Sequence, residues 1–479
     1  MDPEPLHETR ACREPDGLPE KLHLSGRQLR SVKEVATNPI PGARFWRNAG
    51  ESSLVGNTAR PARCRRPRYH RSLATILIPS RIETRPNWAE VSLSALRHNF
   101  HTLQQHLGAD VTICAVVKCN AYGHGVEECA PALQQAGASW FGVTSTDEGI
   151  VLRECGITAR ILVMCGLYPG EEEDALRHSL TPAVFRLEQA EALARAAARM
   201  GLAQPASIHL KIDTGMARLG LPLADLSSFA AGVKSLSQID LEGIFSHLAS
   251  SEVLDDDHTA EQIVRYDRAL QTLAEHGLHP RLRHLANSGA VQARPGTWHN
   301  FVRPGLLLYG YEYPVSRHDG SPVRDLPPLP LKRVLSWKTH VLGLRDVPAG
   351  QALGYGGTYV TTTAARIAVV SVGYGDGLSR KVSIHAGQPV APCETDPMAG
   401  RGAVLLRGQR APIVGRVSMD LTLLDVTNIP GASIGDEVML IGRSGNEHIS
   451  AWDLARSSDT IVYETLCNLS KRVPRRHAE

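Results

Sequence analysis

The sequence predicts an α/β protein in which a (β/α)8 TIM barrel is followed by a C-terminal antiparallel β domain. Up to about residue 310, short and nearly continuous apolar runs alternate with helical patterns, which is typical of a parallel sheet covered by helices. About eight such runs occur within ~220 residues, which matches the repeat number and length of this barrel. After residue 330, alternating apolar and polar residues between Gly and Pro indicate antiparallel strands.

Three segments are expected along the chain. Residues 1–82 are rich in Arg and Pro without a sustained period of 2 or 3.6, so we expect a disordered basic extension, and whether it is translated in the cell is left open. Residues 83–328 are expected to form the barrel and residues 329–479 the β domain. The boundary is placed in the Pro-rich stretch 324–333.

The composition is that of a globular protein. Of the 479 residues, 42% are hydrophobic and 21% are charged, and much of the net charge of +3 comes from the first eighty or so residues. We therefore expect no nucleic-acid or membrane partner, and no apolar run approaches the ~20 residues that span a bilayer. The nine cysteines contain no C-x-x-C pair, so no metal site is predicted. We expect mostly buried thiols and a cytoplasmic, reducing location.

Apolar residues three and four positions apart predict a first helix that Gly108 ends: Leu93, Leu96, Phe100, Leu103 and Leu107. Another helix is predicted over 187–201, ended by Gly201. The expected barrel strands cover residues 113–118, 140–144, 161–165, 182–185, 207–213, 241–247, 281–287 and 302–310.

The C-terminal segment shows strand patterns at 334–344, 366–373, 411–426 and 435–442. Ser450 and Asp453 have the spacing of a capping box and predict a helix start. A further helix is expected near 460–472, before Pro474. The stretch 392–402 is interpreted as a longer loop between strands.

Unusual polar residues occur where the barrel strands end, and these ends meet at a common mouth. Taken singly, each has an ordinary structural explanation, such as a solvated lysine, a satisfied core histidine or a turn. Together they place an amine, an arginine and two loops suited to a phosphate at one mouth. The residues concerned are Lys118, Asp213 to Arg218, His247, Asn287, Ser288, Arg303, Gly305 and Leu306.

An amine, a phosphate cradle and an arginine fit Schiff-base chemistry with an aldehyde cofactor that carries a phosphate. A lysine amine becomes nucleophilic when it is partly desolvated or lies near another cation. Pyridoxal 5'-phosphate has all the required groups, with Lys118 for C4′, backbone N–H groups for the phosphate and Arg303 for the ring nitrogen.

Nine motifs in order and in register make the chain resemble bacterial alanine racemases from about residue 84 to 476, roughly four-fifths of its length. Chance matches would not keep this order and spacing. The motifs are TRPNWAEVSLSALRHN (84–99), AVVKCNAYGHG (115–125), HLKIDTGMARLG (209–220), HLANSGA (284–290), VRPGLLLYG (302–310), LGYGGTY (353–359), VGYGDGLSR (372–380), GRVSMD (415–420) and YETLCNLSKRVPR (463–475).

The resemblance implies a two-base mechanism. Lys118 would hold pyridoxal phosphate and remove the α-proton of D-alanine, while Tyr355 would serve L-alanine on the opposite face. His247 and Arg303 would belong to the network that lets a tyrosine act as a base near neutral pH. Because a guanidinium does not give up its proton, Arg303 would not protonate the pyridine nitrogen.

The remaining implied contacts concern the substrate and the phosphate. Arg218 would meet the substrate carboxylate or the phenolic oxygen of the cofactor, oriented by Lys211, which is carbamylated in some family members. Met419 would contact the substrate carboxylate, and Tyr374 would line the entrance. The phosphate contacts would be Tyr122, Ser288, Gly305 and Leu306, beside Asn287. Two departures are Cys119, where alanine is common, and Lys471, where some members use a tyrosine to reach the phosphate.

The implied function is interconversion of L-alanine and D-alanine to supply peptidoglycan synthesis, by a homodimer in which Tyr355 enters the other subunit's site. A broader racemase, for example for serine, stays open as an alternative. A pyridoxal-phosphate decarboxylase of similar fold is disfavoured by LGYGGTY together with GRVSMD. A non-catalytic pyridoxal-phosphate-binding protein on a bare barrel is disfavoured by the long β domain that carries Tyr355.

Overall fold

The structure is a computed structural model that describes residues 85–383 and 402–479. The expected basic extension, residues 1–82, lies outside the described residues. Of the expected loop of 392–402, residues 392–401 also lie outside the described residues.

Within the described residues, eight parallel strands form the barrel, in the order β10-β2-β3-β4-β5-β6-β8-β9, and the short strand β7 (Leu221–Pro222) also pairs with β6. Just beyond β9 and β10, a parallel bridge between Asn287 and Arg303 joins the two edges, and the Arg303 N–H donates to the Ala286 carbonyl at 3.0 Å. The predicted parallel eight-stranded barrel is therefore confirmed. The strands are β2 (Thr112–Val116), β3 (Trp140–Val143), β4 (Arg160–Val163), β5 (Leu180–Val184), β6 (Ala206–Asp213), β8 (Ile239–Phe245), β9 (Leu282–His284) and β10 (Phe301–Val302).

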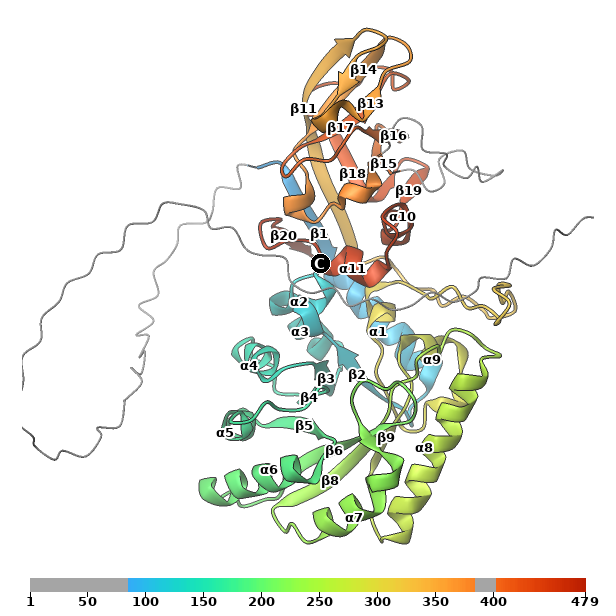
Figure 1. Cartoon of the computed structure of the whole chain (residues 1–479). Helices are drawn as coiled ribbons and strands as arrows, with labels where there is room; N and C mark the ends of the chain where they lie inside the picture. The colour runs from blue at the N-terminus through green and yellow to red at the C-terminus, as the bar shows by residue number, and fades with distance from the viewer. Residues whose placement is uncertain (1–84, 384–401) are drawn as a thin grey trace, which may run out of the picture. The chain divides into compact units, whose positions relative to one another are not determined.

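Helices lie around the outside of these strands (Figure 1). The predicted first helix and the helix of 187–201 are confirmed as α1 and α6, ended by Gly108 and by the left-handed Gly201. The barrel helices are α1 (Leu93–Leu107), α3 (Val126–Gln135), α4 (Thr146–Glu154), α5 (Glu172–Arg177), α6 (Leu187–Met200), α7 (Leu226–Lys234), α8 (Asp257–Glu275) and α9 (Ser288–Ala293).

The eighth predicted strand, 302–310, was wrong over most of its length. The strand β10 is only Phe301–Val302, and the apolar run after Pro304 forms the 3-10 helix η3 (Leu306–Tyr309). All four residues of η3 are buried, and a short buried run has the same apolar pattern in a strand and in a helix. The first strand also ends early, at Val116, so that Lys118 begins the short helical turn α2 (Lys118–Tyr122).

The C-terminal domain is built on a second sheet, which has nine strands among the described residues, in the order β19-β18-β15-β16-β17-β14-β11-β1-β20. Its pairs are antiparallel, as predicted, except that β20 runs parallel to β1. The strand β1 precedes the barrel in the chain yet pairs with β11, which the sequence did not predict. The strands are β1 (Asn87–Ser92), β11 (Leu335–Val347), β14 (Ala365–Val370), β15 (Ala403–Leu406), β16 (Gln409–Val414), β17 (Thr422–Asp425), β18 (Glu437–Ser444), β19 (Glu447–Ile449) and β20 (Arg475–Ala478).

Two helices close the C-terminal domain. The helix α10 (Ala451–Ser457) begins with the predicted capping box of Ser450 and Asp453. The helix α11 (Val462–Cys467) ends at Asn468, well before Pro474, so the second helix is shorter than predicted.

Thiol burial differs from the expectation. Of the six cysteines in the described residues, Cys114 and Cys129 are buried, whereas Cys119 and Cys165 are exposed and the other two are half-buried. The interpretation of the cysteines as mostly buried was therefore wrong for this part of the chain. Among the residues that the structure describes, no helix is long and apolar enough to cross a membrane.

Candidate active site

A cavity of about 520 Å³ lies at the carboxyl ends of the barrel strands. It gathers residues that follow β2, β6, β8, β9 and β10, as the sequence predicts for a barrel of this kind. Most of the barrel residues singled out from the sequence line it: Lys118, Tyr122, Lys211, Met216, Arg218, His247, Asn287, Ser288, Arg303 and Gly305. Asp213 does not line it, and its Oδ1 instead accepts the Gly215 and Ala217 N–H groups at 2.9 and 3.1 Å.

Lys118 enters the cavity from an unusual backbone turn. The four residues after it, Cys119 to Tyr122, all have φ between 53° and 55°, the left-handed region. For residues other than glycine this conformation costs about 1–2 kcal/mol each. The turn is held by Glu148, whose carboxylate accepts the Cys119 N–H at 2.6 Å, and by the Ala121 N–H bond to Val117 at 2.8 Å. The strained turn brings both Lys118 and Tyr122 to the cavity.

Tyr122, Ser288 and Gly305 form one corner of the cavity. The Ser288 hydroxyl accepts the Gly305 N–H at 2.8 Å. A Cβ at position 305 would overlap the Tyr122 hydroxyl and lie 2.9 Å from its Cζ, so the phenol occupies the space that a glycine leaves. Burial raises the pKa of Tyr122 well above its ordinary value, which keeps the phenol a neutral hydrogen-bond donor.

The cavity carries an excess of positive charge. Among the residues that the structure describes, Lys118, Lys211, Arg218 and Arg303 line it, against the single carboxylate of Glu252. Burial, reinforced by the neighbouring Arg303, Arg218 and Lys118 charges, lowers the pKa of Lys211 to about 8. The corner of neutral donors beside these four cations fits an anionic ligand that carries a phosphate.

His247 is neutral in this environment. Burial is the main cause, and the Arg303, Arg218, Lys211 and Lys118 charges add to it, lowering the pKa of His247 to about 3. At neutral pH its imidazole can therefore accept one hydrogen bond and donate another.

Arg303 is buried at the base of the cavity. Its Nη1 donates to His284 Nδ1 at 2.9 Å and to the His284 carbonyl at 3.0 Å, and its Nη2 donates to the Ser246 carbonyl at 2.7 Å. Burial lowers the pKa of Arg303 to about 10, so the guanidinium stays charged at neutral pH. These bonds use the two terminal nitrogens and leave Nε for a ligand in the cavity.

Asn287 has a structural contact already. Its Oδ1 accepts the Ala290 N–H at 3.1 Å as the N-cap of α9, and it also accepts the Ser251 hydroxyl at 2.7 Å. Leu306 does not line the cavity, and its side chain is fully buried, so that a ligand contact would have to use its backbone.

Three residues expected at the substrate lie elsewhere, in the C-terminal domain. Tyr355 is 71% exposed on the 3-10 turn η4 (Tyr355–Gly357) and does not line the cavity. Tyr374 and Met419 are also exposed and neighbour each other, because the Tyr374 N–H donates to Ser418 and the Gly375 N–H to Met419, both at 3.0 Å. Within one chain, then, the structure does not bring these three side chains to Lys118.

Two family models match the chain: "Alanine racemase, N-terminal domain" over residues 91–313 and "Alanine racemase, C-terminal domain" over residues 334–477. The alanine racemase of Halothermothrix orenii is 40% identical over 395 residues, which is 82% of this chain and 97% of that one. The chain belongs to the alanine racemase family.

Solved structures of the family share the fold. An alanine racemase from Bacillus anthracis with bound L-Ala-P is 33% identical with a TM-score of 0.70, covering 82% of this chain and 95% of that one. An alanine racemase from Bartonella henselae with covalently bound pyridoxal phosphate is 28% identical with a TM-score of 0.70, covering 82% of this chain and 99% of that one.

The structure of this alanine racemase family member also shows cavity residues that sequence reasoning missed. The tyrosine of the YETL motif, Tyr463, lines the cavity and packs 5.6 Å from the Tyr122 ring, whereas Lys471 lines a separate depression with Glu148. The motif itself was the available signal for Tyr463. Other lining residues belonged to no motif singled out from the sequence: Thr144, Cys165, Glu252, Tyr313, Trp452 and Ile461.

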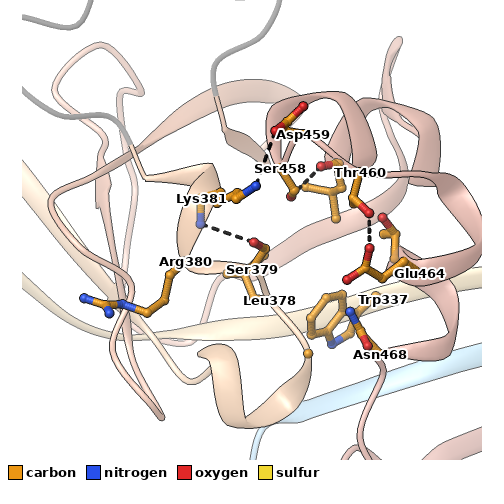
Figure 2. Close-up of a pocket in the computed structure, with 13 residues that line it drawn as sticks. Trp337, Leu378, Ser379, Arg380, Lys381, Ser458, Asp459, Thr460, Glu464 and Asn468 are labelled. Atoms are coloured by element: carbon orange, nitrogen blue, oxygen red, sulfur yellow. Dashed lines mark hydrogen bonds and ion pairs between the residues drawn. The ribbon is translucent and has the colours of Figure 1, made fainter. Parts of the chain in front are cut away.

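A second cavity, of about 180 Å³, lies in the C-terminal domain beside Trp337 (Figure 2). Its lysine, Lys381, is paired with Asp459 at 3.3 Å, and Figure 2 shows the Arg380 side chain pointing away from Glu464. None of the site residues expected from the sequence lines it. The barrel cavity is therefore the candidate active site of this family member.

Proposed function

We propose that this protein interconverts L-alanine and D-alanine with pyridoxal 5'-phosphate as its cofactor. The observation that carries the proposal is the cavity in which Lys118 lies with a corner of neutral donors and with Arg303. Membership of the alanine racemase family along nearly the whole length of its relatives supports the same activity.

The residues present fit the cofactor. Lys118 would hold it, the Tyr122, Ser288 and Gly305 corner would take its phosphate, and Arg303 Nε would face its ring nitrogen. A bound pyridoxal phosphate would supply the electron withdrawal that makes the α-hydrogen of the substrate acidic, once the amino group of the substrate has replaced the Lys118 amine on it and freed that amine.

Lys118 then acts as the base on one face of the substrate. Its amine takes the α-proton of D-alanine, or returns a proton to that face when L-alanine is the substrate. Arg303 donates a hydrogen bond without giving up its proton, which limits the electron withdrawal and favours return of a proton to Cα. His247 lines the same cavity as Lys118 and Arg303 but is neutral, so it adds no positive charge there.

Arg218 supplies the planar fork for an anionic oxygen of the substrate or cofactor. Lys211 is the neighbouring amine whose pKa of about 8 leaves part of it neutral near physiological pH. Carbamylation of Lys211 would place a negative charge beside Arg218 and orient it, as the family resemblance implies.

Tyr355 is assigned the opposite face, in a homodimer. The exposed Tyr355, Tyr374 and Met419 do not line the cavity of their own chain, which supports their use at the cavity of a second copy. The proposal includes the family role of supplying D-alanine for peptidoglycan and a cytoplasmic location.

The direct test offers purified protein, loaded with pyridoxal phosphate, a panel of L-amino acids and measures D-isomers by chiral chromatography. We expect the largest kcat/KM for alanine. Faster conversion of serine would favour the broader racemase. Binding of the cofactor without any D-isomer would support the non-catalytic protein and end the proposal.

Subunit complementation tests the dimer. Lys118→Ala should lose the visible absorbance of the bound cofactor, and Tyr355→Phe should keep it while losing mainly the L-directed step. Mixing Lys118→Ala and Tyr355→Ala subunits should restore about a quarter of the activity, since half of the dimers are mixed and each has one intact site of two. Absence of any recovery in mixed dimers would contradict a site shared between subunits.

A further inference from the structure

A continuous chain of buried side chains runs from Arg303 away from the cavity, through the barrel interior, to Glu242 on β8. Arg303 Nη1 lies 2.9 Å from His284 Nδ1, and His284 Nε2 lies 2.8 Å from His209 Nδ1. His209 Nε2 lies 3.6 Å from Glu242 Oε2, and among the described side chains it has no hydrogen-bond partner at ordinary distance.

The direction of these bonds follows from the arginine. A guanidinium only donates, so His284 Nδ1 must accept and the proton of His284 must be on Nε2. His284 Nε2 therefore donates to His209 Nδ1, which leaves the proton of His209 on Nε2, facing the Glu242 carboxylate. In this series of four side chains, each N–H is therefore directed away from Arg303 and toward Glu242.

Both imidazoles are held in place and kept neutral. His284 stacks on Phe245 with the ring centroids 4.7 Å apart and the planes within 8°. The His209 ring lies against Gly243, where a Cβ would come within 2.6 Å of Nδ1. Burial is the main cause that lowers the pKa of both histidines.

Glu242 supplies the negative end. Burial alone would raise its pKa, but the facing N–H of the neutral His209 and the hydrogen bonds and charge of Arg160 prevail and lower the pKa of Glu242 to about 2. Arg160 binds it with two bonds of 2.5 and 2.6 Å, and Arg281 adds a contact at 3.3 Å. Arg303, in contrast, has only neutral acceptors in the described part of the chain: His284 and the carbonyls of Ser246 and Leu285.

We propose that Glu242, His209 and His284 form a positioning relay that fixes the orientation and donor strength of Arg303 toward the cofactor ring. Its link to the cofactor rests on the proposed function, whereas the relay itself exists in the protein alone. His284 accepts more strongly from Arg303 because its own proton is drawn toward His209 and Glu242. None of the three contacts the substrate, so each acts through Arg303.

Three variants interrupt the relay at defined points. His209→Phe keeps the aromatic packing against Trp140 and Phe301 but removes both nitrogens. Glu242→Gln removes the negative end and keeps the volume. The double variant combines both changes. The control is Asp240→Asn, which neutralises a carboxylate on the same strand that contacts Arg281 but not His209.

The first measurement uses cofactor-free protein labelled with 15N in histidine. The signals that disappear in His209→Phe should report a neutral ring with its proton on Nε2 in the wild type. A proton on Nδ1, or a charged ring at pH 7, would overturn the direction of the relay. This result does not depend on the proposed activity.

The second measurement uses enzyme loaded with pyridoxal phosphate. His209→Phe should lower kcat for alanine about tenfold, as removal of a residue behind a ligand typically does, and should shift the visible absorbance of the cofactor with KM changed less than about twofold. Glu242→Gln should lower kcat less, about threefold, because the distance of 3.6 Å between Glu242 Oε2 and His209 Nε2 is long for a hydrogen bond. Asp240→Asn should match the wild type.

The double variant decides between a relay and separate packing roles. If Glu242 acts on Arg303 only through His209, the double variant should be no slower than His209→Phe alone. Multiplying losses of kcat would overturn the relay. So would variants that lose thermal stability while kcat and the cofactor absorbance stay as in the wild type. Absence of D-alanine formation by the wild type would instead refute the proposed function.

Discussion

Gly305→Ala tests the proposed phosphate contact at the corner of the cavity that Tyr122, Ser288 and Gly305 form. Gly305 has φ of −117°, outside the left-handed region that favours glycine, so we attribute the effect of the added methyl group to its contacts. The new Cβ would overlap the Tyr122 hydroxyl and lie 2.9 Å from its Cζ. The Tyr122 ring cannot retreat freely, because Tyr309 and Tyr463 pack at centroid distances of 5.0 and 5.6 Å.

The expected cost follows from this crowding. Forcing one extra methyl group into a packed site typically costs about 1–3 kcal/mol. We expect this loss in the urea unfolding of the cofactor-free protein, and about tenfold weaker binding of pyridoxal phosphate, since each tenfold in affinity corresponds to about 1.4 kcal/mol. Adding Tyr122→Phe removes the overlapping oxygen and should recover about 1 kcal/mol of the stability.

Gly296→Ala is the matched control, because no atom of the described part of the chain lies within 4 Å of a Cβ at that position. It should change the stability by less than about 0.5 kcal/mol and leave the cofactor affinity unchanged. If Gly305→Ala binds pyridoxal phosphate as tightly as the wild type does, the assignment of this corner to the phosphate is refuted.

Two further predictions concern buried charges. Burial lowers the pKa of Lys211 from the ordinary 10.5 to about 8, so the unfolded chain binds more protons than the folded chain between these pH values. The stability of the cofactor-free wild type relative to Lys211→Met in bicarbonate-free buffer should therefore rise by on the order of 3 kcal/mol from pH 7 to pH 10. An equal difference at both pH values would contradict the lowered pKa. Asp376 is fully buried and accepts bonds from Arg85 at 2.6 and 2.8 Å and from Arg472 at 2.7 Å. Asp376→Ala should cost about 2–3 kcal/mol in urea unfolding, less than a fully buried pair because both arginines are one-third or so exposed. Asp459→Ala, at a carboxylate that is 94% exposed, should change the stability little, and equal effects of the two variants would refute the argument.

The barrel half of the site could be predicted from the sequence because its residues follow strands directly. Lys118, His247, Ser288 and Arg303 come within a few residues of a strand, and the barrel topology brings all strand ends to one mouth. Motifs spread in order along the chain added the chemistry.

The contributions of distant segments could not be predicted in the same way. Trp452, Ile461 and Tyr463 reach the cavity from the C-terminal domain, whose sheet depends on the non-local pairing of β1 with β11 and β20. No local pattern encodes that pairing. The left-handed turn after Lys118 was also unpredictable, because Cys119 and Ala121 are not residue types that favour positive φ.

The two-base assignment is tested most directly by a single-turnover reaction of L-alanine in deuterium oxide with the loaded enzyme. If Tyr355 removes the proton from one face and Lys118 supplies one from the other, the first D-alanine formed should carry solvent deuterium at Cα. D-alanine that keeps the hydrogen of the substrate would contradict two bases, and L-alanine that yields no D-alanine would contradict the proposed function altogether.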